Sequence, residues 1–161
     1  MSRRAWVPAA AAVVLLAGAD GKGCKADREV PVRLVASDLH CGGSATGVSV
    51  QRLASPEALA SAMGGAAGGT ADFGKEVVVI ITAGQKPTAG YGLTLASDRA
   101  PVKDKAAGVR VTFTAPAPGM MAAQVMTSPC LVVALPGEGL ELVGVLEGDK
   151  PVARVSLRRA P

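Results

Sequence analysis

The sequence predicts a mainly β domain, an antiparallel β-sandwich or barrel-like fold of about eight short strands with one short helix. Short apolar runs recur along the chain, and turns rich in Gly and Pro separate them. Val77 to Ile81 are consecutive β-branched residues, the pattern of a strand that is buried on both faces. The chain has 161 residues, of which 49% are hydrophobic but only 2% aromatic. This composition predicts one small domain with a core of Val, Leu, Ile and Ala.

Residues 1–19 have the pattern of a secretory signal peptide. Arg3 and Arg4 precede an apolar run from Ala9 to Leu16, and Ala17-Gly18-Ala19 forms a small-residue cleavage site. The run is shorter than the roughly 20 residues that span a bilayer. An uncleaved anchor and a lipid-modified Cys24 are the alternatives, but the residues before Cys24 lack the apolar residue that such a signal needs. We expect cleavage and no stable membrane insertion afterwards.

Residues 20–45 are predicted to form an N-terminal arm or linker, in which the alternation of Val30, Val32 and Leu34 favours one short strand. Three cysteines are present, and they leave two alternatives open. Either Cys24 and Cys41 form a disulfide and Cys130 is a buried thiol, or all three are unpaired.

His40, the chain's one histidine, stands beside Cys41. Because neighbours in an extended chain point to opposite sides, we interpret it as a surface residue and not as half of a Cys–His pair. Because no second histidine is present, the sequence predicts no metal site. We also expect neither catalytic residues nor a cofactor.

Residues 46–161 are predicted to form the β domain. Val48 and Val50 alternate with polar residues in a strand, and Ser55-Pro56-Glu57 then begins a helix, with Ser55 as N-cap. Gly64-Gly65 ends this helix and begins a Gly/Ala-rich linker to Thr70.

Val77–Ile81 and Tyr91–Leu95 are predicted to form a hairpin joined by the loop from Gly84 to Gly90. Pro87 fixes its own φ, and the two glycines permit positive φ at either end, so we expect this loop to have a defined shape. A defined loop on rigid strands is where proteins usually place recognition.

The later residues predict five further strands. Residues 97–108 are charged and are predicted to be a loop, and Val109–Phe113 then alternates as an amphipathic strand. Ala123–Thr127 and Leu131–Leu135 are predicted to pair across Ser128-Pro129. Residues 140–157 are predicted to be an added C-terminal hairpin that turns at residues 147–150.

Residues 76–136 resemble the C-terminal domain of the PrcB family, exported bacterial proteins named for a subunit of a surface protease complex. The features that carry the resemblance are, in chain order, Asp72-Phe73, the apolar strand and loop up to Tyr91, the Pro116-x-Pro118-Gly119 turn, and Thr127-Ser128-Pro129. Ala89-Gly90-Tyr91 departs from the family's Gly-Gly-Tyr, and a lipidation signal is absent. The resemblance implies a protein of the periplasm or cell envelope of a bacterium.

The same loop more distantly resembles the Asn-Pro-Thr-Thr-Gly-Tyr loop with which chagasin-like proteins enter the cleft of cysteine proteases. Pro87, Thr88, Gly90 and Tyr91 match, whereas Lys86 replaces the Asn and Ala89 the second Thr. The alternative interpretation is a stable turn in which Tyr91 fills the core.

The favoured function is therefore that of a non-enzymatic, exported protein-interaction domain, a subunit or stabiliser of a protease complex. A stand-alone inhibitor of a cysteine protease is the alternative. An enzyme is disfavoured because the acidic residues are scattered, and nucleic-acid binding is disfavoured because no basic stripe interleaved with aromatics is present. The expected partner is a protein, and the expected contact residues are Gln85, Lys86, Pro87, Thr88, Ala89, Gly90 and Tyr91.

Overall fold

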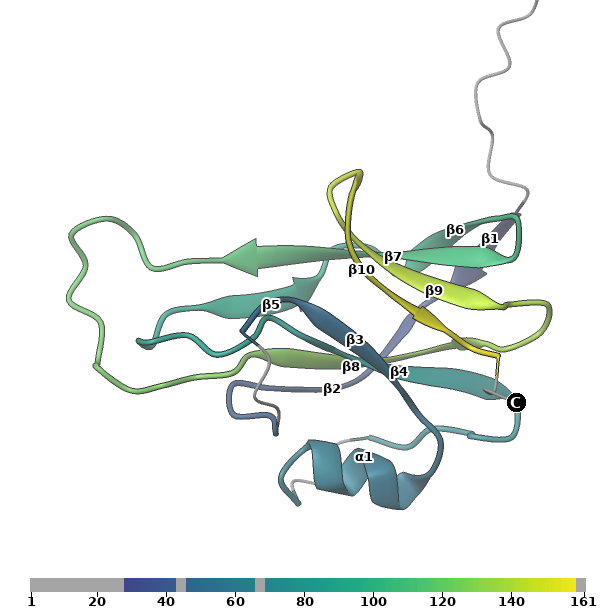
Figure 1. Ribbon diagram of the computed structural model, residues 1–161, viewed down its shortest axis with the longest axis horizontal. Helices are drawn as coiled ribbons and strands as arrows, with labels where there is room; N and C mark the ends of the chain where they lie inside the picture. Colours follow the sequence, from purple (N-terminus) through teal and green to yellow (C-terminus); the bar gives the residue numbers. More distant parts are fainter. Residues whose placement is uncertain (1–27, 43–45, 66–68, 159–161) are drawn as a thin grey trace, which may run out of the picture.

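In the computed structural model, which describes residues 28–42, 46–65 and 69–158, the chain forms two facing β-sheets and one helix (Figure 1). The predicted class, a mainly β sandwich, is confirmed. The predicted signal peptide, residues 1–19, and Cys24 lie outside the described residues. The first sheet contains, in spatial order, β1 (Arg28–Pro31), β6 (Arg99–Lys103), β7 (Ala106–Thr114), β9 (Leu142–Glu147) and β10 (Lys150–Ser156), with β5 (Gly92–Leu95) also paired to β7. The second contains β2 (Arg33–Asp38), β8 (Cys130–Pro136), β4 (Glu76–Thr82) and β3 (Ser49–Leu53).

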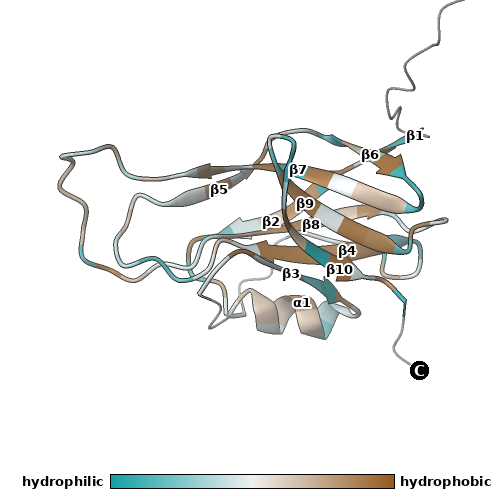
Figure 2. Cartoon of the chain, turned by 45° about the horizontal axis from the view of Figure 1, so that its top comes forward, coloured by the Kyte–Doolittle hydropathy of each residue, from teal (hydrophilic) through white to brown (hydrophobic). Residues whose placement is uncertain are grey.

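The main core lies between the two sheets, where apolar side chains from both inner faces meet (Figure 2). Val79 and Ile81 of β4 and Val133 of β8 pack there against Val109 and Val145 of the other sheet. Burying such a side chain is worth about 1.5–3 kcal/mol, so this layer supplies much of the folding free energy.

A second apolar cluster covers the outer face of the β4–β8 sheet, beneath the helix α1 (Pro56–Ala62). Leu59 and Met63 cover Val78 and Ile80 of β4 there. β4 is therefore buried on both faces, as its run of β-branched residues predicts.

The helix begins and ends where the sequence predicts. Ser55 Oγ accepts a hydrogen bond from Ala58 N at 3.2 Å, Pro56 opens the helix, and Gly64 follows the C-cap Met63 with φ 64°. The predicted C-terminal hairpin is also present, as β9 and β10 with Glu147 paired to Lys150.

The predicted hairpin of β4 with β5 is wrong. β4 pairs with β3 on one side and β8 on the other, while β5 pairs with β7 in the facing sheet. Both edges of β4 are already occupied, so the chain after Thr82 crosses from one sheet to the other. The fold also departs from a purely antiparallel sandwich, since β7 and β9 pair in parallel.

Three further local predictions are corrected. Part of the predicted arm belongs to the sandwich, because β1 pairs with β6 and β2 with β8. The predicted charged loop 97–108 contains β6, in which Ala100 and Val102 are buried, and a tight turn in which Asp104 and Lys105 have φ of 49° and 65°. The predicted strand 123–127 is absent, and only Thr127 forms an isolated bridge, to Lys86.

The disulfide joins Cys41 to Cys130, with the Cα atoms 6.0 Å apart. The predicted pairing of Cys41 with Cys24 is thereby corrected, and Cys130 is a buried half-cystine and not a buried thiol. The bridge ties the segment after β2 to the start of β8. Met63 Sδ lies 3.9 Å from both cysteine sulfurs and so joins the helix end to the same cluster.

Candidate protein-binding site

The predicted recognition loop and the connection between β7 and β8 leave the sandwich at the same end, where they lie side by side (Figure 1). The first runs from Ala83 to Tyr91 and the second from Ala115 to Pro129. Connections that exceed about 12–15 residues without regular structure are uncommon in compact domains and are usually functional or disordered. The second loop, the connection from β7 to β8, lies at this limit.

Backbone hydrogen bonds fasten the two loops to each other. Lys86 N donates to Thr127 O at 2.8 Å, and Thr127 N donates to Lys86 O at 3.0 Å. Ala83 N donates to Pro129 O at 2.9 Å nearer the sheets, and Ala89 N donates to Ala123 O at 3.0 Å farther along. The bonds satisfy backbone groups that would otherwise require water, so the two loops should move as one unit.

The two glycines of the first loop have the backbone geometry that the sequence predicts. Gly84 has φ 76° and Gly90 has φ 94°, both in the region that disfavours residues with a Cβ. A Cβ on Gly90 would also lie 3.1 Å from Pro116 Cβ. The Pro116 turn of the second loop therefore packs directly on the first.

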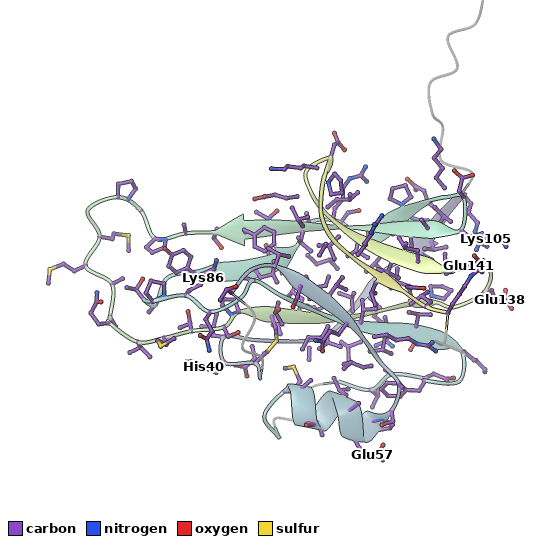
Figure 3. All side chains as sticks on the ribbon, in the orientation of Figure 1. His40, Glu57, Lys86, Lys105, Glu138 and Glu141 are labelled. Carbon is purple, nitrogen blue, oxygen red and sulfur yellow. A yellow bond between two sulfur atoms is a disulfide. The ribbon has the colours of Figure 1, made fainter. Side chains whose placement is uncertain are left out.

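Tyr91 is half-buried and does not fill the core. The Lys86 ammonium lies 5.6 Å from the centre of its ring, within the range of a cation–π interaction (Figure 3). Thr88 contributes its carbonyl oxygen, which accepts a hydrogen bond from Thr127 Oγ1 at 3.2 Å. Each of these three predicted contact residues is thus partly committed to contacts within the domain.

The other predicted contact residues lie at the surface. Gln85, Pro87 and Gly90 are exposed, whereas Ala89 is half-buried. The structure brings all seven predicted residues to one end of the sandwich, on one ordered loop.

Sequence reasoning missed the most exposed apolar side chains at this end. The side chains of Met120, Met121, Val125 and Met126 are 66%, 102%, 51% and 62% exposed. Val125 and Met126 lie in the predicted strand 123–127, whereas Met120 and Met121 were assigned to no element. The signal that could have found them is the pair Met120-Met121 directly after the Pro/Gly turn that interrupts the strand pattern.

The segment after β2 reaches the base of the same end. Ser128 N donates to Leu39 O at 2.7 Å, and Cys41 N donates to Ser128 O at 3.2 Å. His40 is exposed, as expected, with Nδ1 3.9 Å from Asp38 Oδ1. Cys41 carries no free thiol because it is bonded to Cys130, so this neighbouring Cys–His pair has no nucleophile.

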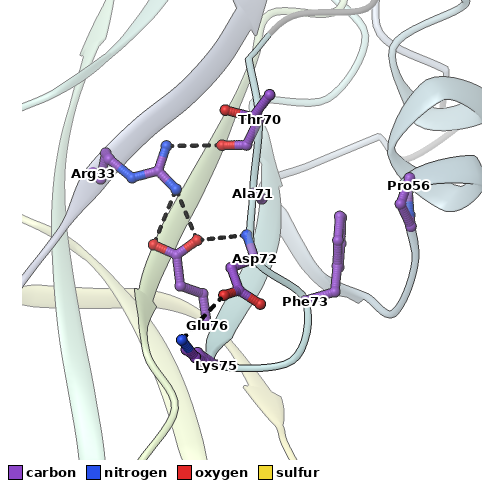
Figure 4. Close-up of a pocket in the computed structure, with 8 residues that line it drawn as sticks. All are labelled: Arg33, Pro56, Thr70, Ala71, Asp72, Phe73, Lys75 and Glu76. Atoms are coloured by element: carbon purple, nitrogen blue, oxygen red, sulfur yellow. Dashed lines mark hydrogen bonds and ion pairs between the residues drawn. The ribbon is translucent and has the colours of Figure 1, made fainter.

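A shallow pocket elsewhere on the surface is lined by charged groups that already have partners (Figure 4). Arg33 Nη2 donates to both carboxylate oxygens of Glu76, at 3.0 and 2.7 Å, and Nη1 donates to Thr70 O at 3.0 Å. Asp72 N donates to the same carboxylate at 2.9 Å. The Arg33 hydrogen bonds, followed by that from Asp72, lower the pKa of Glu76. This cluster attaches the segment before β4 to β2.

Another group of charges lies at the opposite end from Lys86 (Figure 3). Glu141 forms ion pairs with Lys105 and Arg158, and these hydrogen bonds lower its pKa. Across residues 28–42, 46–65 and 69–158, no group of three or more His, Cys, Asp or Glu side chains could hold a metal ion. In the same residues, no helix is both long and apolar enough to cross a membrane.

The fold and this geometry define a β-sandwich with one end built from two hydrogen-bonded loops. Residues 77–136 match the family model described as PrcB C-terminal, which confirms the resemblance seen in the sequence. The match covers a little over a third of the chain, from β4 to β8, and includes both loops in full. No curated protein and no solved structure matched the chain.

Proposed function

We propose that this protein is an exported, non-enzymatic interaction domain that acts as a subunit or stabiliser of an envelope protease complex. Its proposed binding surface is the end of the sandwich that carries the loop from Gly84 to Gly90. The observation that carries the proposal is the set of backbone hydrogen bonds between this loop and residues 123–129, within the segment that matches PrcB C-terminal.

A loop fixed in this way loses less conformational entropy when it binds, so more of its contact energy contributes to affinity. Its base is attached to β4 and β8, which are the most deeply buried strands of the second sheet. The backbone of Lys86 is hydrogen-bonded within the domain. The neighbouring side chains of Gln85 and Pro87 are exposed and can contact a partner.

The arrangement of ionisable groups supports a role without catalysis. Glu76 forms an ion pair with Arg33, and Glu141 forms one with Lys105. Both carboxylates lie away from the loop end. At the loop end, Asp38 accepts a hydrogen bond from His40 N, and no nucleophilic thiol lies beside the imidazole in the described residues. Among the residues that the structure describes, this distribution does not bring together an acid, a base and a nucleophile of the kind that hydrolysis requires.

Export is proposed from residues 1–19 and receives support from the disulfide. Bridges such as Cys41–Cys130 form and persist in oxidising compartments and are rare in the cytosol. We place the mature chain in the periplasm or cell envelope of a bacterium.

Affinity capture with the mature chain as bait, from the envelope of the source bacterium, tests the proposal. We compare the parent with Lys86→Ala/Thr88→Ala and with the control Lys150→Ala, at the exposed first residue of the distant strand β10. Parent and control should co-purify a protease together with other subunits, and the loop variant should retain less of them. Absence of a protease from the material captured by the parent contradicts the proposal.

The alternative is a stand-alone inhibitor of a cysteine protease, and the observation that favours it is the ordered loop Lys86–Tyr91 at a protruding end. An activity assay with a purified papain-type protease distinguishes an inhibitor from a subunit. An inhibitor reduces its activity at stoichiometric concentration and loses this effect in Lys86→Ala/Thr88→Ala. A subunit leaves the activity of the isolated protease unchanged.

A further inference from the structure

We infer that the main anchor for the protein partner is the segment Met120–Met126, which inserts its methionine side chains into an uncharged, apolar pocket of that partner. This inference rests on the proposed function, since it concerns the same end of the sandwich. It assigns the first loop, Ala83–Tyr91, a supporting and orienting role.

The segment concentrates apolar surface that the fold leaves uncovered. Six large hydrophobic residues are strongly exposed in the described part of the chain, and four of them lie within residues 120–126. Such a concentration of exposed apolar side chains on a soluble domain marks an interaction site more often than a packing defect. Methionine is also enriched at protein interfaces.

The segment is held in place by hydrogen bonds, so its side chains are presented from a fixed backbone. Met120 N donates to Ala117 O at 3.1 Å, Val125 N donates to Ala123 O at 2.9 Å, and Ala123 O also accepts Ala89 N. Sulfur atoms project from this loop into solvent beyond the ends of the sheets (Figure 3). Several backbone groups of the loop thus bond within the domain, while its methionine and valine side chains are exposed.

The first loop is a weaker candidate for the anchor. The aromatic ring of Tyr91 is half-buried and is covered in part by the Lys86 ammonium. The exposed side chains of this loop, Gln85 and Pro87, are not the large apolar groups that usually dominate binding energy.

The absence of charged residues from this segment indicates which kind of partner surface binds it. Residues 115–129 contain no Asp, Glu, Lys, Arg or His, and the nearest cation on the adjoining loop, Lys86, lies over Tyr91. A membrane-binding segment combines apolar residues with Lys or Arg that attract anionic lipids, and this segment has neither cations nor aromatics. A protruding, uncharged segment instead complements a concave, uncharged pocket of a protein, and the flexible thioethers adapt to its shape.

The first arm of the test uses the same capture experiment with a different pair of variants. Met120→Ser/Met121→Ser should reduce retention of the partner at least about tenfold, as expected when a hot spot is removed. Met120→Leu/Met121→Leu keeps the apolar volume and should stay within about threefold of the parent. Leu34→Ser, at a 48% exposed site on β2, is the matched surface control and should leave retention unchanged.

The second arm identifies the contact directly. With p-benzoylphenylalanine in place of Met121, irradiation of the complex should yield one cross-linked partner peptide that lines an apolar pocket. The same group in place of the exposed Asp149 should yield no such adduct. A cross-link to a flat, charged surface overturns the inference.

Two other binding partners, a lipid surface and a second copy of this chain, are each tested by a separate measurement. Methionine-dependent sedimentation with phosphatidylglycerol and phosphatidylethanolamine vesicles overturns the inference in favour of a lipid surface. Methionine-dependent dimerisation in analytical ultracentrifugation overturns it in favour of a second copy of this chain.

The inference and the proposed function fail in distinguishable ways. If the parent captures a protease complex and Lys86→Ala/Thr88→Ala weakens capture while the serine pair does not, only the methionine anchor is wrong. If the parent captures no protease, both are wrong. Equal melting temperatures of parent and serine pair are expected, because the replaced side chains are exposed.

Discussion

Lys86 and Thr127 exchange two backbone hydrogen bonds, of 2.8 and 3.0 Å, and thereby join two loops that the sequence places on opposite sides of β5, β6 and β7. The pairing makes the end of the sandwich a single ordered unit. It also places the loop predicted for recognition beside the exposed methionines, of which the sequence pattern assigned only Met126 to a strand.

Thr127→Val should loosen this unit while the sandwich stays folded. Thr127 is buried, and its Oγ1 donates to Thr88 O, so valine keeps the volume and leaves that carbonyl without this donor. We expect a loss of about 1 kcal/mol in the free energy of unfolding, measured by denaturant titration. Hydrogen exchange at the Lys86 amide should become faster. Thr94→Val, at an exposed position of β5, is the control, and equal exchange in both variants would contradict a fastening role.

Gly90→Ala should destabilise the protein through backbone geometry. Gly90 has φ 94°, and an added Cβ would lie 3.1 Å from Pro116 Cβ. Placing a residue other than Gly in such a conformation costs about 1–3 kcal/mol. Gly47→Ala is the matched control, because its Cβ would meet no atom within 4 Å and its φ is not positive. A melting temperature of Gly90→Ala equal to that of the control would show that the loop rearranges without cost.

The fold class was predictable because its signals are local. The β-branched run of β4, the Ser55 cap with Pro56, and the turn at Gly148 each act over a few residues, and each is found where the sequence predicts it. The choice of strand partner is not local. β4 and β5 are neighbours in sequence but lie in different sheets, because β3 and β8 occupy both edges of β4.

The candidate site was predictable only in part for the same reason. Gly84 and Gly90 marked an ordered loop, and their positive φ angles are found. The residues near Met121 carry no local signal that this segment forms hydrogen bonds with the loop between β4 and β5 and does not pair with a strand. Likewise, the Cys41–Cys130 bridge spans 89 residues, and the spacing of three cysteines cannot choose among their pairings.

The pair of Arg33 and Glu76 predicts a pH dependence of stability. Hydrogen bonds from Arg33 lower the pKa of Glu76 below its ordinary value of 4.5, and the charged form is thus favoured in the folded state. The resulting stabilisation is present above pH 4.5 and is lost as the pH falls through the lowered pKa. Since both side chains are partly exposed, the contribution should be below about 1 kcal/mol. Denaturant titrations of Glu76→Gln between pH 7 and about pH 3 should show a flatter pH profile than the parent.

A double-mutant cycle provides the control for this pair. Arg33→Ala should flatten the same part of the profile, and Arg33→Ala/Glu76→Gln should add little beyond either single change. Fully additive losses would mean that the two side chains act independently.

Cleavage of the predicted signal peptide has a direct test. Arg3 and Arg4, the apolar run and Ala17-Gly18-Ala19 predict a mature chain that begins at Asp20. Intact-mass measurement of protein from the periplasm should show the loss of residues 1–19. Ala17→Arg, which places a large charged residue at the cleavage site, should leave the precursor uncleaved. A mass that includes a lipid on Cys24 would contradict the prediction, as would full-length protein in the cytoplasm.

Removal of the disulfide should weaken the base of the loop end. Cys41 and Cys130 connect the segment after β2 to the start of β8, and Met63 packs on both sulfurs. Loss of such a bridge typically costs about 2–5 kcal/mol, so Cys41→Ala/Cys130→Ala should unfold at lower denaturant concentration. Peptide mapping without reduction should return one linked pair that contains Cys41 and Cys130. Cys24→Ala is the matched control and should leave both the linked pair and the unfolding midpoint unchanged. A linked peptide that contains Cys24 would show that the chain uses a different pairing, and Cys24→Ala would then also lower the unfolding midpoint.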